Sequence, residues 1–347
     1  MVWLVKISSI VRRLGANLEL ASFYSKGVVK GQGKRLLKAL SSAAKKARFF
    51  QIVTGRWKVA RLDEFLFSKT PLGPGGKEYW FIQVASTSGD KTQLVLTFGR
   101  SFFGAWVNGR AGHGGKVAAV GWYFSGKKKV FVEDSVPLEA QKGSLKTRSF
   151  EFRGAFPHYE LSAGRGTQLR FSKPASGVPF EALDASANSL GLGMLNIYLD
   201  ARGTVGGKKF SGLAYLQKVV VTAPFLPWNW ARLTFPDKSV LDFYAVRPES
   251  RDIGTYLFRS ATYRLASGRT VKLGECRLRR LAGDRWLLEG KGVTAYLKTY
   301  ASKPFLLKGR GEFHYDEYMV ECTDFAYGNI SKQSGIGLVE DAYGFLL

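Results

Sequence analysis

Short runs of alternating apolar and polar residues follow one another along the chain from residue 73 onward. The first two, residues 79–84 and 93–98, are joined through Ser88-Gly89-Asp90 and predict a β-hairpin. Further strands are expected at residues 117–124, 129–132, 149–152, 159–161, 167–171, 195–199 and 212–221. Short, regularly spaced strands with glycine-rich turns are typical of sandwiches and up-and-down barrels, so the pattern predicts an all-β protein.

A second series of runs with the same texture occupies residues 230–340. The two series end in similar segments, residues 211–218 and 334–341, and aligning these segments places Gln217 opposite Glu340. A repeat at the corresponding end of each series predicts two copies of one fold. The division between the copies is expected near residues 224–227.

A basic amphipathic helix is predicted over residues 34–50, where Leu36, Leu37, Leu40 and Phe50 recur at helical spacing. It belongs to an N-terminal extension, residues 1–72, that we expect to be partly helical. The helix either attaches to an anionic membrane surface or packs on the body with a solvated basic face. The basic residues concerned are Lys34, Arg35, Lys38, Lys45, Lys46 and Arg48.

The formal net charge of the 347-residue chain is +25, which favours contact with phosphate groups of lipids or of nucleic acid. Basic β-barrels with exposed aromatic side chains bind single strands by stacking, so nucleic-acid binding is one alternative function. Many aromatic residues, such as Trp80 and Tyr198, lie in strand runs where they more simply fill an interior. No apolar run reaches the ~18 residues of a membrane span, and Lys6 interrupts the apolar start of the chain. We expect a cytoplasmic protein, and peripheral membrane attachment through the predicted helix is one of the two alternatives for that helix.

The sequence lacks the spacings of common metal and nucleotide sites. Two cysteines, Cys276 and Cys322, and three histidines do not form a zinc pattern, and we expect no metal and free, buried thiols, although pairing stays open. The glycine-rich segment 108–116 lacks the spacing of a phosphate-binding loop, so we expect a flexible loop there. No dinucleotide fingerprint or serine-nucleophile motif is present, and no cofactor is expected.

The order Gly212-x-x-Tyr215-x-Gln217-Lys218, followed by Pro224, Pro227 and Trp228-Asn229-Trp230, resembles an inter-domain motif of a known superfamily. This is the tandem lipocalin-like superfamily of carotenoid 1,2-hydratases (hydroxyneurosporene synthases) and, more distantly, tocopherol cyclases. The resemblance implies two calycin-type antiparallel β-barrels in tandem, over residues 73–224 and 225–347. It also implies a long isoprenoid or polyene ligand and protonation of a carbon–carbon double bond.

The resemblance carries Tyr215 over as the family tyrosine, whereas Gln217 stands where the family has a carboxylic acid. Asp200 and Glu340 are therefore the candidate acids, and each has the alternative of being a solvated or salt-bridged carboxylate. Strand alternation puts Tyr215 and Gln217 on one face, which we expect to line the first barrel's cavity. A non-catalytic lipid carrier is the alternative to a hydratase-like or cyclase-like enzyme. The candidate ligand-binding residues are Tyr215, Gln217, Trp228, Trp230, Tyr198 and Trp80.

Overall fold

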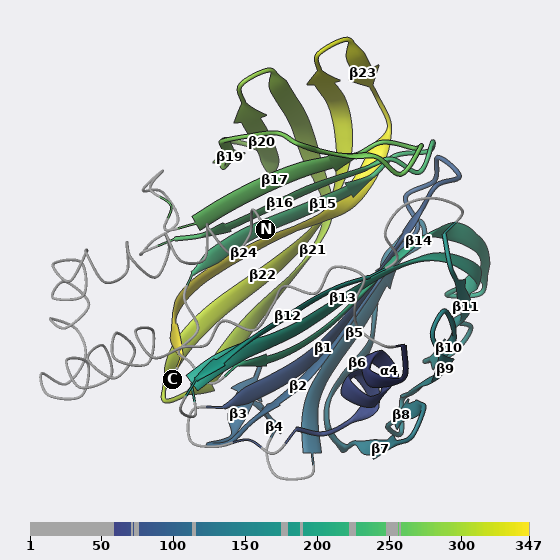
Figure 1. The fold of residues 1–347 in the computed structure, drawn as a ribbon, viewed down its shortest axis with the longest axis vertical. Helices are drawn as coiled ribbons and strands as arrows, with labels where there is room; N and C mark the ends of the chain where they lie inside the picture. Colours follow the sequence, from purple (N-terminus) through teal and green to yellow (C-terminus); the bar gives the residue numbers. More distant parts are fainter. Residues whose placement is uncertain are drawn as a thin grey trace, which may run out of the picture.

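The computed structural model describes residues 59–70, 72, 76–112, 116–174, 180–187, 190–221, 227–247, 256 and 258–346. Within these ranges the chain forms two 12-stranded antiparallel sheets and one nine-residue helix (Figure 1). The predicted basic helix over residues 34–50 lies outside the described residues. The expectation of an all-β protein is confirmed.

The first sheet contains twelve strands, accompanied by the helix α4 (Val59–Phe67). Its strands are β1 (Lys77–Ser86), β2 (Gln93–Ser101), β5 (Lys116–Phe124), β6 (Lys128–Pro137), β7 (Glu139–Gln141), β8 (Ser144–Lys146), β9 (Phe150–Ala155), β10 (His158–Ala163), β11 (Gln168–Ser172), β12 (Phe180–Ala187), β13 (Leu190–Val205) and β14 (Lys208–Val221).

The second sheet is built mainly from the C-terminal part of the chain. Its strands are β15 (Trp228–Thr234), β16 (Val240–Val246), β17 (Phe258–Arg264), β18 (Thr270–Lys272), β19 (Cys276–Leu281), β20 (Arg285–Gly290), β21 (Val293–Gly309), β22 (Gly311–Tyr327), β23 (Ile330–Lys332) and β24 (Gly335–Leu346), together with β3 (Ala105–Val107) and β4 (Arg110–Gly112).

The strand order supports the predicted repeat. The first sheet runs β6-β5-β2-β1-β14-β13-β11-β10-β9-β8-β7, and its two edge strands β6 and β7 follow each other in sequence, so the sheet curls into a nearly closed barrel. The second sheet runs β18-β17-β16-β15-β24-β22-β21-β20-β19. In each sheet the last long strand pairs with the first, β14 with β1 and β24 with β15. The two sheets therefore share one topology.

The helix α4 lies inside the first barrel (Figure 1), and the buried side chains of the barrel pack against it. Leu62, Leu66 and Phe67 of the helix belong to the barrel's core. Lys218 holds the helix in place, because its Nζ donates to the carbonyl oxygen of Phe65 at 2.5 Å and to that of Ser68 at 2.6 Å. The end of the predicted extension is thus part of the folded body.

The outer face of β14, β1, β2 and β5 packs against one face of β15, β24, β22 and β21. We call this apolar contact region the inter-sheet layer. A hydrogen bond from Gln93 Nε2 to the carbonyl oxygen of Gly337, 2.9 Å long, also crosses it. Its buried apolar members are Phe81, Val95, Val120, Trp122, Tyr215, Ala301, Phe305, Phe313, Tyr315, Met319, Leu338, Ala342 and Leu346.

Part of the glycine-rich segment that was expected to be a flexible loop forms a hairpin. The strands β3 and β4 pair with each other, and β3 also pairs with β21 of the second sheet. Asn108 and Gly109 both have positive φ, 50° and 80°, as the Asn-Gly turn of a tight hairpin requires. Asn108 also accepts from the backbone N–H of Leu306 at 2.8 Å, which anchors the turn. The loop expectation was therefore wrong for residues 110–112, which form β4, whereas Asn108 and Gly109 form the turn.

Candidate functional site

Two glutamates face each other in the inter-sheet layer. Glu317 of β22 and Glu340 of β24 are direct cross-strand partners, and the alternation of each strand turns both side chains toward the first sheet. Glu317 has no exposed surface and Glu340 is 7% exposed. Buried carboxyls are rare unless they are paired or serve a chemical role, so this carboxyl pair is the centre of the candidate site.

Each member of the carboxyl pair has the same kinds of hydrogen-bond partners. Trp122 Nε1–H donates to Glu317 Oε2 at 2.5 Å, and Trp228 Nε1–H donates to Glu340 Oε2 at 2.9 Å. The hydroxyl oxygen of Tyr315 lies 2.8 Å from Glu317 Oε1 and 2.6 Å from Glu340 Oε1. A hydroxyl has one proton, so it donates to one carboxylate and accepts from the other carboxyl, which must itself be protonated. The geometry is that of two acids sharing protons through Tyr315.

Burial gives the pair a raised affinity for protons. Burial first, and then the neighbouring Glu340, raise the pKa of Glu317 to about 8. Burial likewise raises the pKa of Glu340 to about 7, against the opposing effect of its hydrogen bonds from Tyr315 and Trp228. The two groups titrate as a coupled pair, which retains a proton at neutral pH.

The first sheet carries an uncharged counterpart of the carboxyl pair. Asn196 of β13 and Gln217 of β14 are cross-strand partners, as Glu317 and Glu340 are in the second sheet. Gln217 Nε2 donates to Asn196 Oδ1 at 3.0 Å and lies 2.8 Å from the hydroxyl of Tyr215, which donates to Asn196 Oδ1 at 2.9 Å. Two amides of the first sheet thus correspond to two carboxyls of the second, whereas the tyrosines lie on non-equivalent strands, Tyr215 on β14 and Tyr315 on β22.

Tyr215 and Gln217 lie on the outer face of the first barrel, so the expectation that they line its cavity was wrong. The interior face of β14 is formed by Ala214, Leu216 and Lys218. Alternation decides which residues share a face, but it does not say which face turns inward. Tyr215 instead contacts the second sheet, with its ring 5.5 Å from that of Trp230.

A row of three side chains on β15 connects the two polar clusters. Trp228, Trp230 and Arg232 alternate along the strand, so they share the face turned toward the first barrel. Trp230 pairs across the strands with Glu340 and contacts the ring of Tyr215. The Arg232 guanidinium lies 4.9 Å from the centre of the Tyr215 ring. Trp228 and Trp230, both expected ligand contacts, therefore lie beside the carboxyl pair.

Tyr198, Trp80 and Asp200, also named from the sequence, have different surroundings. Tyr198 stacks on Tyr215 at 5.6 Å, so it belongs to the same aromatic layer. Trp80 lies in the interior of the first barrel, where its Nε1–H donates to the carbonyl oxygen of Leu66 at 2.8 Å. Asp200 forms a 2.9 Å ion pair with Lys238, which matches the salt-bridged alternative for this residue.

Sequence reasoning missed Glu317, Tyr315 and Trp122, although it named Glu340. The available signal was a glutamate and a tyrosine two residues apart in a strand run, which places both on one face. The role of Trp122 follows only from the docking of β5 onto the second sheet, and no local pattern encodes that docking.

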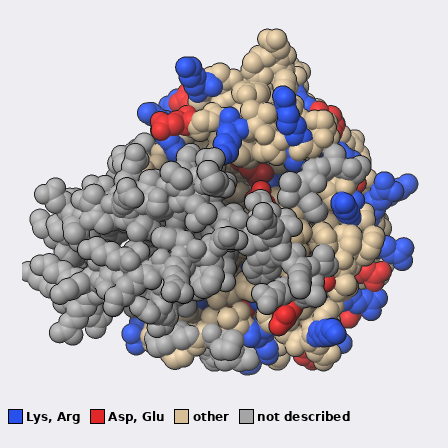
Figure 2. Space-filling view, viewed as in Figure 1, with Lys and Arg blue, Asp and Glu red and all other residues tan. Residues whose placement is uncertain are grey.

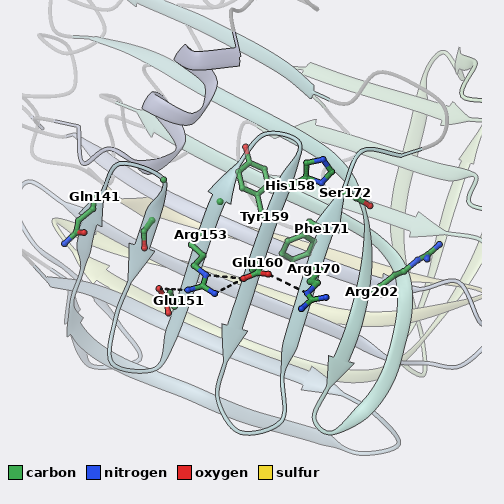
Figure 3. Close-up of a pocket in the computed structure, with 13 residues that line it drawn as sticks. Gln141, Glu151, Arg153, His158, Tyr159, Glu160, Arg170, Phe171, Ser172 and Arg202 are labelled. Carbon is green, nitrogen blue, oxygen red and sulfur yellow. Dashed lines mark hydrogen bonds and ion pairs between the residues drawn. The ribbon is translucent and has the colours of Figure 1, made fainter.

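A separate open groove of about 850 Å³ lies on the outer side of the first barrel (Figure 3). Arg153, Glu160 and Arg170 cross it on β9, β10 and β11, and Glu160 pairs with Arg153 at 2.9 Å and with Arg170 at 3.6 Å. No residue expected from the sequence lines it. Figure 2 shows Lys and Arg side chains distributed around both sheets with Asp and Glu among them, over the described part of one face.

Within the described ranges, no group of three His, Cys, Asp or Glu side chains is placed to hold a metal ion. Cys276 and Cys322 are both buried and free. No helix among the described residues is long and apolar enough to cross a membrane.

Comparison with known proteins supports the fold. No protein-family model matches the sequence, and no curated protein matches it significantly. A provisionally assigned AttH protein from Nitrosomonas europaea has a similar structure, with a TM-score of 0.52, 14% sequence identity, and coverage of 84% of this chain and 98% of that one. Two structures of CghA are also similar. CghA alone has a TM-score of 0.47, 10% identity, and 80% and 91% coverage, and CghA with Sch210972 has 0.43, 10%, 78% and 88%. The likeness to the AttH structure, together with the two antiparallel sheets, supports a lipocalin-like, all-β fold.

Proposed function

We propose that the protein binds an isoprenoid, polyene or similar apolar ligand at the inter-sheet layer and protonates one of its carbon–carbon double bonds with the carboxyl pair. The observation that carries the proposal is the pair itself, Glu317 and Glu340, buried among aromatic rings and joined by Tyr315. A protonated carboxyl in an apolar site can donate a proton at neutral pH. The rings of Trp228, Phe313 and Tyr315 beside the pair provide the apolar surroundings that such a ligand needs.

The proposed reaction requires the carboxyl pair, the ligand and, for hydration, one water molecule. The O–H bond of one carboxyl breaks, a C–H bond forms at one carbon of the double bond, and a carbocation is left at the other. Water or a hydroxyl of the ligand then forms a C–O bond with the cation and returns a proton to the carboxylate. Capture of the cation by water is a hydration, and capture by the ligand's own hydroxyl is a cyclisation.

The aromatic rings beside the pair have a role in this step. Trp228 lies 5.6 Å from the ring of Tyr315, and Trp230 lies 5.5 Å from that of Tyr215. A cation over an aromatic face gains about 2 kcal/mol when it is desolvated. Tyr315, in contact with both acids, provides a route by which either carboxyl can recover its proton from the other.

A non-catalytic lipid carrier is the second candidate function. The observation in its favour is the 2.5 Å hydrogen bond from Trp122 of the first sheet to Glu317 of the second, which ties the two sheets together. In a carrier this bond serves only to hold the sheets in register. Removal of the acid therefore distinguishes the two candidates. In an enzyme it stops conversion of the ligand, whereas in a carrier it changes only the stability of the protein.

The test begins with organic extraction of the purified full-length protein and mass spectrometry of any bound lipid. The protein is then incubated with acyclic polyenes, and products with one added water or an altered ring count are sought. Glu317→Gln and Glu340→Gln are expected to abolish turnover while retaining bound ligand, and Asp200→Asn is the control that leaves turnover unchanged. Ligand binding without turnover by the native protein supports the carrier, and the absence of both rejects the proposal.

A further inference from the structure

Three large aromatic side chains are exposed immediately after β2. Phe102 is 49% exposed, Phe103 is 36% exposed and Trp106 is 40% exposed. The rings of Phe102 and Phe103 contact each other edge to face, with centroids 5.1 Å apart. Single exposed aromatic side chains are ordinary, but three within five residues form an apolar patch of the kind that marks an interaction site.

The patch continues onto the turn between β21 and β22. Trp106 of β3 is the cross-strand partner of Lys308, so their side chains share one face. The guanidinium of Arg310, in the turn itself, lies 3.9 Å from the centre of the Phe103 ring. These five residues, Phe102, Phe103, Trp106, Lys308 and Arg310, form what we call the aromatic tip. It lies at the end of the second sheet where β3 joins β21 (Figure 1).

Basic side chains predominate around the tip. Lys308 has one acidic neighbour, Glu312, at 3.0 Å, and both side chains are more than half exposed, so the solvent screens their pairing. Lys116 is exposed and is the first residue of β5. Gly99 of β2 pairs with Ala118 of β5, so Lys116 lies at the same end of the barrel as Phe102, which follows β2. Among the described residues near the tip, Lys116, Lys308 and Arg310 are basic, whereas Glu312 and Glu133 are acidic, and Glu133 is already paired with Lys303 at 3.0 Å.

We infer that the aromatic tip docks onto the surface of an anionic lipid bilayer. The headgroup region accommodates aromatic rings that are apolar on one side and near water on the other, and Trp is enriched there. Lys and Arg beside the rings are attracted to anionic phosphates and carboxylates at the same depth. Charge complementarity, with a net charge of +25 on the whole chain, therefore favours this occupant. The tip is distinct from the predicted basic helix over residues 34–50.

The direct test uses the full chain with vesicles of phosphatidylcholine alone and of phosphatidylcholine with phosphatidylserine. Binding is expected only to the anionic vesicles. Phe102→Ser/Phe103→Ser/Trp106→Ser is expected to lower the partition coefficient at least about tenfold. Tyr296→Ser is the matched control, because Tyr296 is 44% exposed at the far end of the same strand β21. Arg310→Glu is expected to weaken binding more than Lys272→Glu, a change at an exposed lysine of the edge strand β18.

Depth is tested with lipids brominated on the acyl chains. Quenching of tryptophan fluorescence is expected in the native protein and is expected to fall in Trp106→Phe, which still binds the vesicles. Unchanged vesicle binding by the triple variant would overturn the inference and assign binding to another part of the chain. Equal losses in the triple variant and in Tyr296→Ser would also overturn it, as would no binding by the native protein. A change in sedimentation of the triple variant without a change in vesicle binding would instead identify the tip as a contact between copies of this chain.

Discussion

Replacing Glu317 by Gln should change how the protein's stability depends on pH. Burial keeps Glu317 protonated in the folded state up to about pH 8, whereas the unfolded carboxyl, with a pKa of about 4.5, has already lost its proton at pH 5.5. The unfolded state therefore binds fewer protons between these values, and stability falls as the pH rises. One such group costs about 1.4 kcal/mol per pH unit, or about 2 kcal/mol between pH 5.5 and 7.0.

Glu317→Gln removes this dependence because an amide does not titrate. The free energy of unfolding is measured in urea at pH 5.5, 6.0, 6.5 and 7.0 for both proteins. The difference between them should shift by about 2 kcal/mol in favour of the variant over this range, whatever the fixed cost of the substitution at any one pH. Glu133→Gln is the control. The hydrogen bond from Asn108 and the neighbouring Lys303 lower the pKa of Glu133, so this group is ionised in both states over the same range. A difference for Glu317→Gln that stays constant with pH, or that shifts against the variant, would refute the reasoning.

Two further substitutions test how the fold is held together. Lys218→Met should lower the free energy of unfolding by about 3 kcal/mol in urea, because the carbonyl oxygens of Phe65 and Ser68 lose their donor and Glu78 loses its 3.0 Å ion pair while it keeps the 2.7 Å pair with Arg100. A change below about 1 kcal/mol would contradict a structural role for Lys218. Gly337→Ala should prevent cooperative folding, as judged by circular dichroism and thermal unfolding, because its Cβ would lie 1.9 Å from the carbonyl oxygen of Arg232. Gly193→Ala, whose Cβ would meet nothing closer than 3.5 Å, is the matched control, and equal stability of the two variants would contradict this account.

The fold could be predicted from the sequence because each strand has its own alternating pattern and the series of strands is repeated. Alternating runs identify strands one at a time, and the similar endings around Gln217 and Glu340 mark the strand that completes each sheet. In the structure these strands are β14 and β24, each paired with the first strand of its sheet. The hairpin β3–β4 was missed because its strands have only three residues and join a sheet formed mainly by the other half of the chain.

Only part of the candidate site could be predicted from the sequence. Glu340 could be named because it aligns with Gln217, but Glu317 becomes its partner only through the register between β22 and β24. The face occupied by Tyr215 could not be deduced, since both faces of β14 are buried: one in the barrel and the other against the second sheet. A strand buried on both sides carries no polar face to indicate the outside.

Deuterium incorporation is the most direct test of the carboxyl pair as a proton donor. The native protein is incubated with an acyclic polyene in D₂O, and the recovered lipid is analysed by mass spectrometry, beside Glu317→Gln/Glu340→Gln. The account predicts one deuterium on carbon for each turnover by the native protein and none with the double variant. Equal incorporation by both proteins, or product without carbon-bound deuterium, would contradict it.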